Sequence, residues 1–393
     1  MAKFDIKKFF KENKSYCPLP FKEIYSGNDG IYKLCCEADK SGHNYTTRDT
    51  TPFKFFDSPE MEEVRDKMMN GEKLKECGFC YRLEEKGYPS YRTSRYSDGV
   101  ANFFPNAGER NISIKLKMLG SLCNLECYMC HPGNSSGRRN QLKKMDFIGD
   151  EDIGFSLASL KRKAPTNYVS WNDIITELLD NIHRIEKIHM IGGEPLQLPK
   201  HWELVDKIPP EHAKHIRVSY DTNATMIRYK NHTIWDVIDK FHPDTWISVS
   251  ADHYGEREAW IRHPKDIESF ERNLDEIKEY VGQVHITVSL LNIYDLFEIR
   301  EYYNKKFGLQ CLMNNTVMDP RMLSIKNLPD KEKEKLIEKY KDADYDFTEY
   351  EGNRLVAEME KPRVEEEYQA GLKYMRELSK IRGDYTKLWP NIV

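Results

Sequence analysis

Three cysteines in one short run constrain this chain more than any other feature of its sequence. They stand in Cys123-Asn-Leu-Glu-Cys127-Tyr-Met-Cys130, so one tight loop can direct all three sulfurs at a single point. A closed structural zinc site needs a fourth ligand. A [4Fe–4S] cluster has four irons, and three thiolates would leave one of them open to another ligand. The alternative is a zinc knuckle completed by a distant ligand such as His131.

The segment before this loop is predicted to be a strand. Residues 111–119 alternate apolar and polar side chains, and Gly120-Ser121 ends the run. The cysteine loop would then lie at the C-terminal end of a strand, where α/β proteins place their functional groups.

Strands and helices alternate through the region that follows. Further strands are expected at residues 186–191, 215–220, 245–250, 283–291 and 310–317, and helices at 173–185, 234–241, 266–281 and 292–307. Six strands with a connection between each and the next predict an α/β fold with a parallel sheet and right-handed crossovers.

Two strand ends carry residues suited to ligand binding. Gly192-Gly193-Glu194-Pro195 follows the second strand. Its paired glycines let a ligand approach the backbone, and Glu194 offers a carboxylate to a cation. Ser250 ends a later strand and either contacts a ligand or caps backbone groups. Arg262, twelve residues further on, either contacts a ligand or forms a surface ion pair.

The N-terminal region contributes a second set of thiols. Cys17 precedes two short β-prone runs around Asn28-Asp29-Gly30, a strong hairpin signal that would bring Cys17 near Cys35 or Cys36. A helix capped by Ser58 is expected at residues 58–69, and Cys77 and Cys80 follow it. Four thiolates are enough to saturate a cluster or a zinc ion, and alternation along the strand does not decide between Cys35 and Cys36.

The Cys123–Cys130 run resembles the CxxxCxxC signature of the radical SAM enzymes. The resemblance implies that Cys123, Cys127 and Cys130 hold a [4Fe–4S] cluster whose open iron binds S-adenosylmethionine (SAM). Reductive cleavage of SAM would give a 5′-deoxyadenosyl radical that abstracts a substrate hydrogen. The implied fold is a partial (β/α)6 barrel over residues 111–325.

The same resemblance implies a set of SAM contacts. The Gly192–Glu194 turn matches the family's GGEP motif, whose backbone and Glu hold the SAM amino group. Ser250 and Arg262 match positions that contact SAM in similar enzymes. Met129 stands where the family usually has an aromatic residue, and it can also pack against an adenine ring.

The N-terminal cysteines resemble the SPASM or "twitch" module of a large radical SAM subgroup, which holds an auxiliary [4Fe–4S] cluster. The resemblance favours Cys17, Cys35, Cys77 and Cys80 as its ligands, with structural zinc as the alternative. In most of those enzymes the module follows the core, whereas here it comes first. The expected organisation is an auxiliary module at 1–90, a linker at 91–110, the core at 111–325 and a helical extension at 326–393.

Composition and charge indicate which class of protein this is and in which compartment we expect it. The formal net charge of −4 gives no indication of nucleic-acid binding. No apolar run approaches the roughly 18 residues of a membrane span, and the first residues lack a signal-peptide core, so we expect a cytoplasmic protein. Nine cysteines in that reducing compartment favour metal or cluster binding over disulfides. Cys311 lies in an apolar run and is expected to be a buried thiol.

The predicted activity is hydrogen abstraction from an unidentified peptide or small-molecule substrate, in oxidation or cross-linking of a peptide or protein or in modification of a metabolite. An electron donor such as flavodoxin or ferredoxin would reduce the cluster. The competing hypothesis is a non-enzymatic zinc or iron–sulfur scaffold. Residues 132–167 show no clear period and are predicted to be a long basic loop, either a lid over the site or a solvated surface segment.

Overall fold

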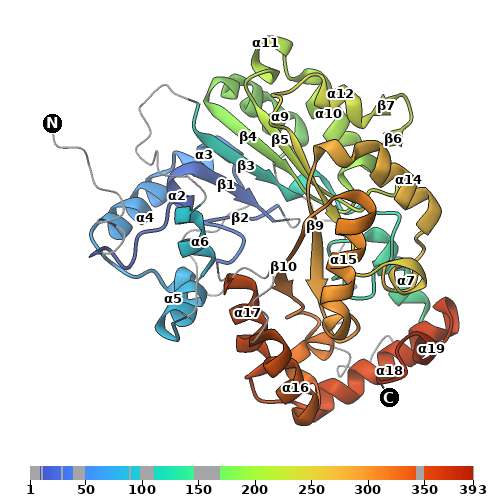
Figure 1. Cartoon of the computed structure of the whole chain (residues 1–393). Coiled ribbons are helices and arrows are strands. Elements are labelled where there is room, and N and C mark those ends of the chain that lie inside the picture. Colours follow the sequence, from blue (N-terminus) through green and yellow to red (C-terminus); the bar gives the residue numbers. More distant parts are fainter. Residues whose placement is uncertain are drawn as a thin grey trace.

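The computed structural model describes Phe9 and residues 12–27, 30–38, 49–87, 90–97, 110–145, 169–341 and 349–392. Figure 1 shows the chain as one sheet surrounded by helices, with the N-terminal elements at one edge and the C-terminal helices at the opposite end. The strands of the main sheet are β1 (Glu23–Ser26), β2 (Tyr32–Lys33), β3 (Ile112–Leu116), β4 (Ile185–Met190), β5 (Arg217–Thr222), β8 (Trp246–Ser250), β9 (Val281–Val288) and β10 (Cys311–Thr316). A separate small hairpin pairs β6 (Arg228–Tyr229) with β7 (His232–Thr233).

The strand order of the main sheet is β10-β9-β8-β5-β4-β3-β1-β2. From β3 to β10 every neighbouring pair is parallel and follows chain order, as connections of one hand produce. The prediction of an α/β fold with six parallel strands is therefore confirmed. Sequence reasoning missed that β1 pairs in parallel with β3, so that the N-terminal hairpin extends the same sheet.

Helices cover the sheet and its edges. In the N-terminal region they are α2 (Leu19–Lys22), α3 (Pro52–Phe56), α4 (Pro59–Met69), α5 (Gly78–Glu85) and α6 (Tyr91–Ser97). In the central region they are α7 (Ser136–Lys144), α9 (Trp171–Asp180), α10 (Pro199–Lys207), α11 (Pro210–Ala213), α12 (Ile234–Ile238), α13 (Gly255–Ile261), α14 (Ile267–Ile277) and α15 (Leu296–Phe307). The C-terminal extension consists of α16 (Asp330–Lys341), α17 (Glu349–Met359), α18 (Glu365–Arg382) and α19 (Tyr385–Leu388).

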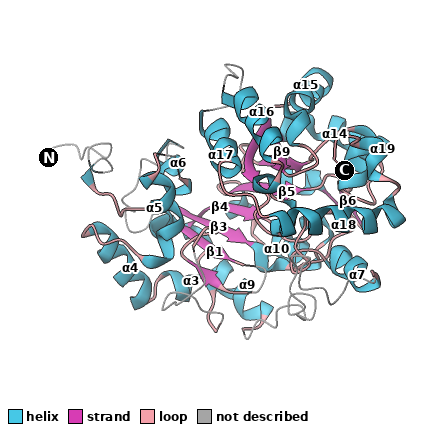
Figure 2. Ribbon diagram, turned by 90° about the horizontal axis from the view of Figure 1, so that it is seen from below, coloured by secondary structure: helices cyan, strands magenta, loops and turns pink. Residues whose placement is uncertain are grey.

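The two faces of the sheet differ in polarity. Side chains on one face, such as Ile114, Val218 and Val284, are fully buried beneath helices and form the core. Their neighbours on the other face are mostly hydrophilic and partly exposed. Figure 2 shows α3 and α6 on opposite sides of β1 and β3. The face on the α6 side is thus not a packed apolar core.

Several predicted helices are present, but they begin or end at other residues than predicted. Ser58 caps α4 by accepting a hydrogen bond from the Met61 amide at 3.3 Å. The helix predicted at 173–185 begins at Trp171 and ends at Asp180, because a 3₁₀ turn separates it from β4. The helix predicted at 266–281 ends at Ile277, and Val281 already belongs to β9.

Two predictions of irregular structure were wrong where the structure describes them. Residues 136–144, predicted as loop, form α7, and residues 91–97 of the predicted linker form α6. The helical period of α7 was hidden because its inward face carries Arg138 and Gln141, both buried, beside a single apolar Leu142. The remainder of both segments, 146–168 and 98–109, lies outside the described residues. The predicted role of residues 132–167 as a lid is therefore left open.

Candidate active site

The cysteine loop lies where β3 ends, and neighbouring elements hold its backbone. The amide of Glu126 donates to the carbonyl of His263 at 2.6 Å, and the amide of Tyr128 donates to the carbonyl of Ile261 at 2.9 Å. Within the loop, Ser135 Oγ donates to the carbonyl of Leu125 at 2.9 Å. These bonds fix the path of a loop that has no regular secondary structure of its own.

The glycine turn after β4 lies against the same loop. The Gly193 amide donates to the carbonyl of Gly120 at 3.0 Å, and the Glu194 amide donates to the carbonyl of Leu122 at 2.7 Å. A Cβ atom on Gly193 would lie 2.1 Å from the Leu122 oxygen, which no side chain tolerates. Glycine is therefore required here because of the close approach between the two backbones, and the turn and the cysteine loop form one unit.

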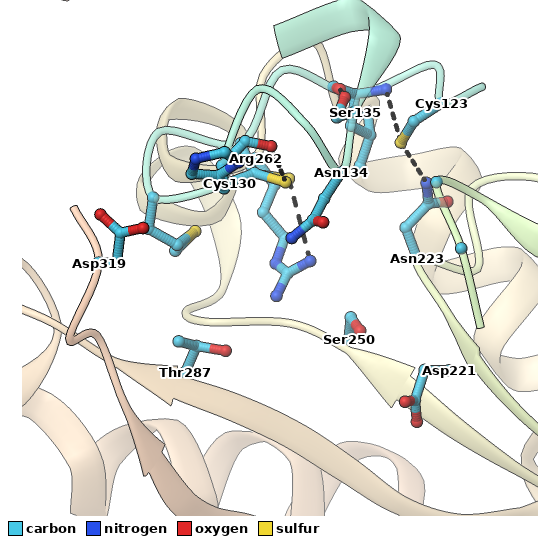
Figure 3. A pocket seen from close by; sticks show the side chains of 16 residues that line it. Cys123, Cys130, Asn134, Ser135, Asp221, Asn223, Ser250, Arg262, Thr287 and Asp319 are labelled. Atoms are coloured by element: carbon cyan, nitrogen blue, oxygen red, sulfur yellow. Dashed lines mark hydrogen bonds between the residues drawn. The ribbon is translucent and has the colours of Figure 1, made fainter. Parts of the chain in front are cut away.

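One cavity of about 270 Å³ unites the predicted residues. Its walls include the three thiols, Met129, Gly192, Gly193, Ser250 and Arg262, together with Leu125, His131, Asn134, Ser135, Asp221, Asn223, Thr287 and Asp319. Figure 3 shows Cys123 and Cys130 on the loop side, and Asp221, Ser250 and Thr287 at strand ends across from them. Of the predicted site residues in this region, Glu194 alone is not part of the wall.

The three thiols of the loop influence one another. Burial raises the pKa of Cys130 to about 12, and the nearby Cys127 adds to the rise. Burial also raises the pKa of Cys123, with Cys127 and Cys130 among its charged neighbours. Three thiols that share one loop suit thiolate ligation of a soft metal centre, whose positive charge compensates the charge of the thiolates.

Arg262 belongs to a buried ionic network beside Cys127. Its Nε donates to Asp252 Oδ2 at 2.7 Å, and its Nη1 lies 4.0 Å from Cys127 Sγ. Glu258 accepts from Lys265 at 2.6 Å, so two acids and two bases balance. Although burial opposes a charge, Asp252 and Cys127 raise the pKa of Arg262, and the guanidinium stays positive. The predicted alternative, a surface ion pair, is wrong because Arg262 is 8% exposed.

Glu194 differs from the expectation that it binds a ligand cation directly. Its carboxylate is buried and accepts from Thr222 Oγ1 at 2.7 Å and from the Asn223 amide at 2.8 Å. Burial raises its pKa to about 7, although the bonds from Asn223 and Thr222 oppose the rise. In this structure Glu194 ties the glycine turn to the end of β5, and the backbone of Gly192 and Gly193 faces the cavity.

Two asparagines near the strand ends, Asn223 and Asn292, have different roles. Asn223 lies in the cavity wall, and its Nδ2 is 3.9 Å from Cys123 Sγ. Asn292 is fully buried, and its amide bonds the backbone of Ser289, Asp252 and Thr287. Asp221, Thr287 and Asp319 were not singled out, because only the strand register reveals that they face the same cavity.

The N-terminal thiols form a second group. Burial raises the pKa of Cys17 well above its usual value, with Cys77 and Cys80 as charged neighbours. The pKa of Cys35 is likewise raised by burial, with Cys36, Cys17, Cys77 and Cys80 as its charged neighbours. For Cys36 the strongest charged neighbours are instead Lys115, Glu37 and Glu23. Cys35 thus has Cys17, Cys77 and Cys80 among its charged neighbours, whereas the strongest ones of Cys36 include Lys115 of β3.

Among the described residues, no three His, Cys, Asp or Glu side chains converge closely enough to hold a single metal ion. A tetrahedral zinc with Zn–S bonds of about 2.3 Å requires such convergence. A multi-iron cluster does not, because each cysteine binds a different iron atom. The His131 Nδ1 atom, considered as a zinc ligand, accepts from the Gly133 amide at 3.0 Å.

A scan against protein families bears on this site. The model of the Radical SAM superfamily matches residues 118–305, which include the three-cysteine loop, the glycine turn and the Ser250–Arg262 segment. Residues 118–305 thus resemble a radical SAM domain. The match leaves out the N-terminal cysteines and the strands β1, β2, β3 and β10.

Solved structures of other proteins also show some likeness to this chain. Streptococcus suis SuiB, crystallised with S-adenosylmethionine, is 11% identical over 65% of this chain, with a TM-score of 0.32. TYW1, solved with a lysine-pyruvate adduct, is 15% identical over 72% of this chain and 88% of its own, with a TM-score of 0.34. The chain spans 44% of the SuiB chain. Likeness at this level supports neither a shared substrate nor a shared reaction.

A search among curated proteins finds no match. None of the helices in the described part of the chain has the length and apolar character needed to cross a bilayer.

Proposed function

We propose that this chain is a radical SAM enzyme that reductively cleaves S-adenosylmethionine and removes a hydrogen atom from a substrate. The observation that carries the proposal is one cavity whose wall combines the thiols of Cys123, Cys127 and Cys130 with the Gly192-Gly193 turn. A [4Fe–4S] cluster held by three thiolates supplies, when bound, an open iron for SAM and the electron that splits the sulfonium into methionine and a 5′-deoxyadenosyl radical.

The donor set fits such a cluster. Its three sulfurs come from one loop whose backbone is fixed by α13 and by residues 121–136. Arg262 stays charged beside Cys127 and offsets the negative charge of the ligated thiolates. The Asn223 amide near Cys123 offers a hydrogen bond to sulfur.

The rest of the wall suits SAM. Gly192 and Gly193 leave no side chain between the backbone and a ligand, so peptide groups can approach the amino-acid part of SAM. Ser250 and Thr287 provide hydroxyls at strand ends, and Met129 provides a polarisable surface for an adenine ring. Positioning one hydrogen near the radical and excluding water determines which bond reacts.

Four N-terminal thiols support a second, auxiliary [4Fe–4S] cluster as part of this proposal. Cys17, Cys35, Cys77 and Cys80 influence one another electrostatically, as ligands of one centre would. Such a centre would accept an electron from the substrate radical or anchor the substrate. Structural zinc is the alternative for this site, and iron content distinguishes the two.

For the substrate, the proposal names a class of molecule and not a particular compound. A peptide or small molecule would be oxidised, cross-linked or otherwise modified, and a donor such as flavodoxin or ferredoxin would supply the electron. A non-enzymatic scaffold that kept the domain is the competing function, and the same experiment decides between them.

Anaerobic reconstitution with iron and sulfide, followed by reduction in the presence of SAM, tests the proposal. We expect about eight irons per chain and formation of 5′-deoxyadenosine with methionine. The Cys123→Ala variant should lose roughly half of the iron and all SAM cleavage, because two thiols do not retain the cluster. Cys311→Ala removes a thiol buried in β10, away from both groups, and should behave as the wild type. Stoichiometric zinc with no SAM cleavage would favour the scaffold.

A further inference from the structure

The inner face of the sheet, on the α6 side, carries polar side chains between α6 and the cavity of the cysteine loop. Strand register places Lys115 of β3 beside His189 of β4, and His189 beside Ser219 of β5. Two residues further along β5, Asp221 reaches the SAM cavity. The inward-facing positions are Ser113, Lys115, Lys187, His189, Arg217, Ser219, Asp221, Trp246, Ser248, Ser250, Gln283, His285 and Thr287. A face lined this way faces solvent or a ligand, because it cannot form an apolar core.

Most charged side chains on this face have a partner of opposite charge. The acid Asp221 lies 3.2 Å from His189 Nε2, and Arg217 pairs with Glu186. Glu23 of β1 lies 3.9 Å from Lys115 Nζ, which also donates to the Tyr91 hydroxyl at 2.9 Å. Each inward acid is thus already matched by a base.

Lys187 is the exception. Its ammonium lies 5.2 Å from the Trp246 ring, and no carboxylate of the described residues lies within ion-pair distance of it. Burial lowers its pKa to about 8, and the positive charges of Arg95 and Lys115 add to the effect. A cation kept among other cations without a counter-ion is costly unless an anion joins it.

We propose that this inner face of the sheet binds an anionic group of the substrate, a carboxylate or a phosphate, between Lys187 and Lys115. This inference rests on the proposed function and names the class of substrate for that site. Lys187 lies four strand positions below the layer of Asp221, which is about 13 Å at the usual rise per residue. The substrate is therefore extended: its anionic group lies about that far from the hydrogen that is removed.

The pH response follows from the groups around Lys187. It faces Arg95 of α6, Lys115 of β3, Arg217 of β5 and Glu23 of β1. Lys187 is protonated below about pH 8 and loses its charge above it. Anion affinity should therefore fall as the pH rises from 7 to 9. A bound anion in turn raises the pKa of Lys187.

Isothermal titration of the reconstituted protein with glutarate and with glycerol 3-phosphate tests the proposal, the two probes distinguishing a carboxylate from a phosphate subsite. We expect at least one to bind, more than tenfold more weakly to Lys187→Met, and with partial recovery in Lys187→Arg. Lys214→Met, at an exposed lysine outside this face of the sheet, is the matched control. Lys187→Gln replaces the Met variant if that protein does not fold.

Binding of neither anion, or equal affinity in the wild type and Lys187→Met, overturns the inference. Because titration requires no turnover, the two proposals fail separately. SAM cleavage without Lys187-dependent anion binding contradicts only the anionic substrate. Anion binding without SAM cleavage contradicts only the proposed function.

Discussion

Gly193 shows how a single residue joins two halves of the site. Its missing Cβ lets the turn after β4 lie against Leu122, one residue before the first cysteine of the loop. A larger residue must push the cysteine loop and the glycine turn apart. The constraint comes from backbone contact and not from an unusual dihedral angle.

Gly193→Ala should therefore weaken SAM binding by at least tenfold and lower the melting temperature, because neither backbone can move cheaply. Gly352→Ala in α17 is the control, since its Cβ would make an ordinary contact of 3.6 Å and a helix favours alanine by up to about 1 kcal/mol. Equilibrium binding of SAM and thermal unfolding measure both effects. Wild-type affinity in Gly193→Ala would contradict the close approach described for this turn.

A second residue sets the acid sensitivity of the fold. His201 is fully buried, shares a 2.6 Å hydrogen bond with the Tyr220 hydroxyl, and burial lowers its pKa to about 3. The unfolded chain binds a proton near pH 6.5, whereas the folded chain does not. His201 therefore leaves the free energy of unfolding unchanged above pH 6.5. As the pH falls below 6.5, His201 lowers that free energy.

His201→Gln keeps a hydrogen-bonding group for Tyr220 and removes the titration. Between pH 7.5 and 5 the wild type should lose about 2 kcal/mol more unfolding free energy than the variant. Urea denaturation of both proteins at the two pH values measures the difference. Parallel losses in the two proteins would show that His201 is protonated in the folded state.

Among the elements outside residues 118–305, α18 bonds the cysteine loop directly. Tyr374 donates to the carbonyl of Tyr128 at 2.9 Å, within the cysteine run. Arg382, at the end of the helix, donates to the carbonyl of Trp260 at 2.8 Å and to that of Glu126. The C-terminal helix thus holds the outer side of the cysteine loop.

Arg382→Ala should leave the partly buried carbonyls of Glu126 and Trp260 without this donor, at a cost of about 1 kcal/mol. The loop should hold its cluster less firmly, so we expect iron to be lost to a chelator several times faster. Lys380→Ala, which removes only a surface pair with Glu377, is the control. Equal rates of iron loss in both variants would mean that α18 does not support the loop.

Sequence patterns predicted the elements where local chemistry determines them. The alternation of residues 111–119 and the spacing of the three cysteines are local, so β3 and the cysteine loop were predictable. The helix α7 was not, because Arg138 and Gln141 are buried by polar bonds to the loop. The hydrogen bonds to the Glu194 carboxylate come from Thr222 and Asn223. These residues lie 28 and 29 positions away in the sequence, and only the fold brings them close.

At the scale of the whole molecule, the N-terminal hairpin and the six parallel strands from β3 to β10 form one sheet. β1 pairs with β3 across a long stretch of sequence, and Glu177 of α9 accepts from the Phe53 amide at 2.9 Å, at the start of α3. The four-residue β1 gave no signal of its partner. Through this pairing, Cys36, Tyr91 and Lys115 connect the N-terminal thiols to the inner face of the sheet.

The central claim is that the cluster of Cys123, Cys127 and Cys130 keeps one iron open for SAM. Electron paramagnetic resonance of the reduced, reconstituted protein tests it most directly, with the auxiliary site removed by Cys77→Ala and Cys80→Ala so that one cluster is observed. We predict that adding SAM shifts the g-values of the reduced cluster, because the ligand binds iron. A spectrum unchanged by saturating SAM would contradict the claim.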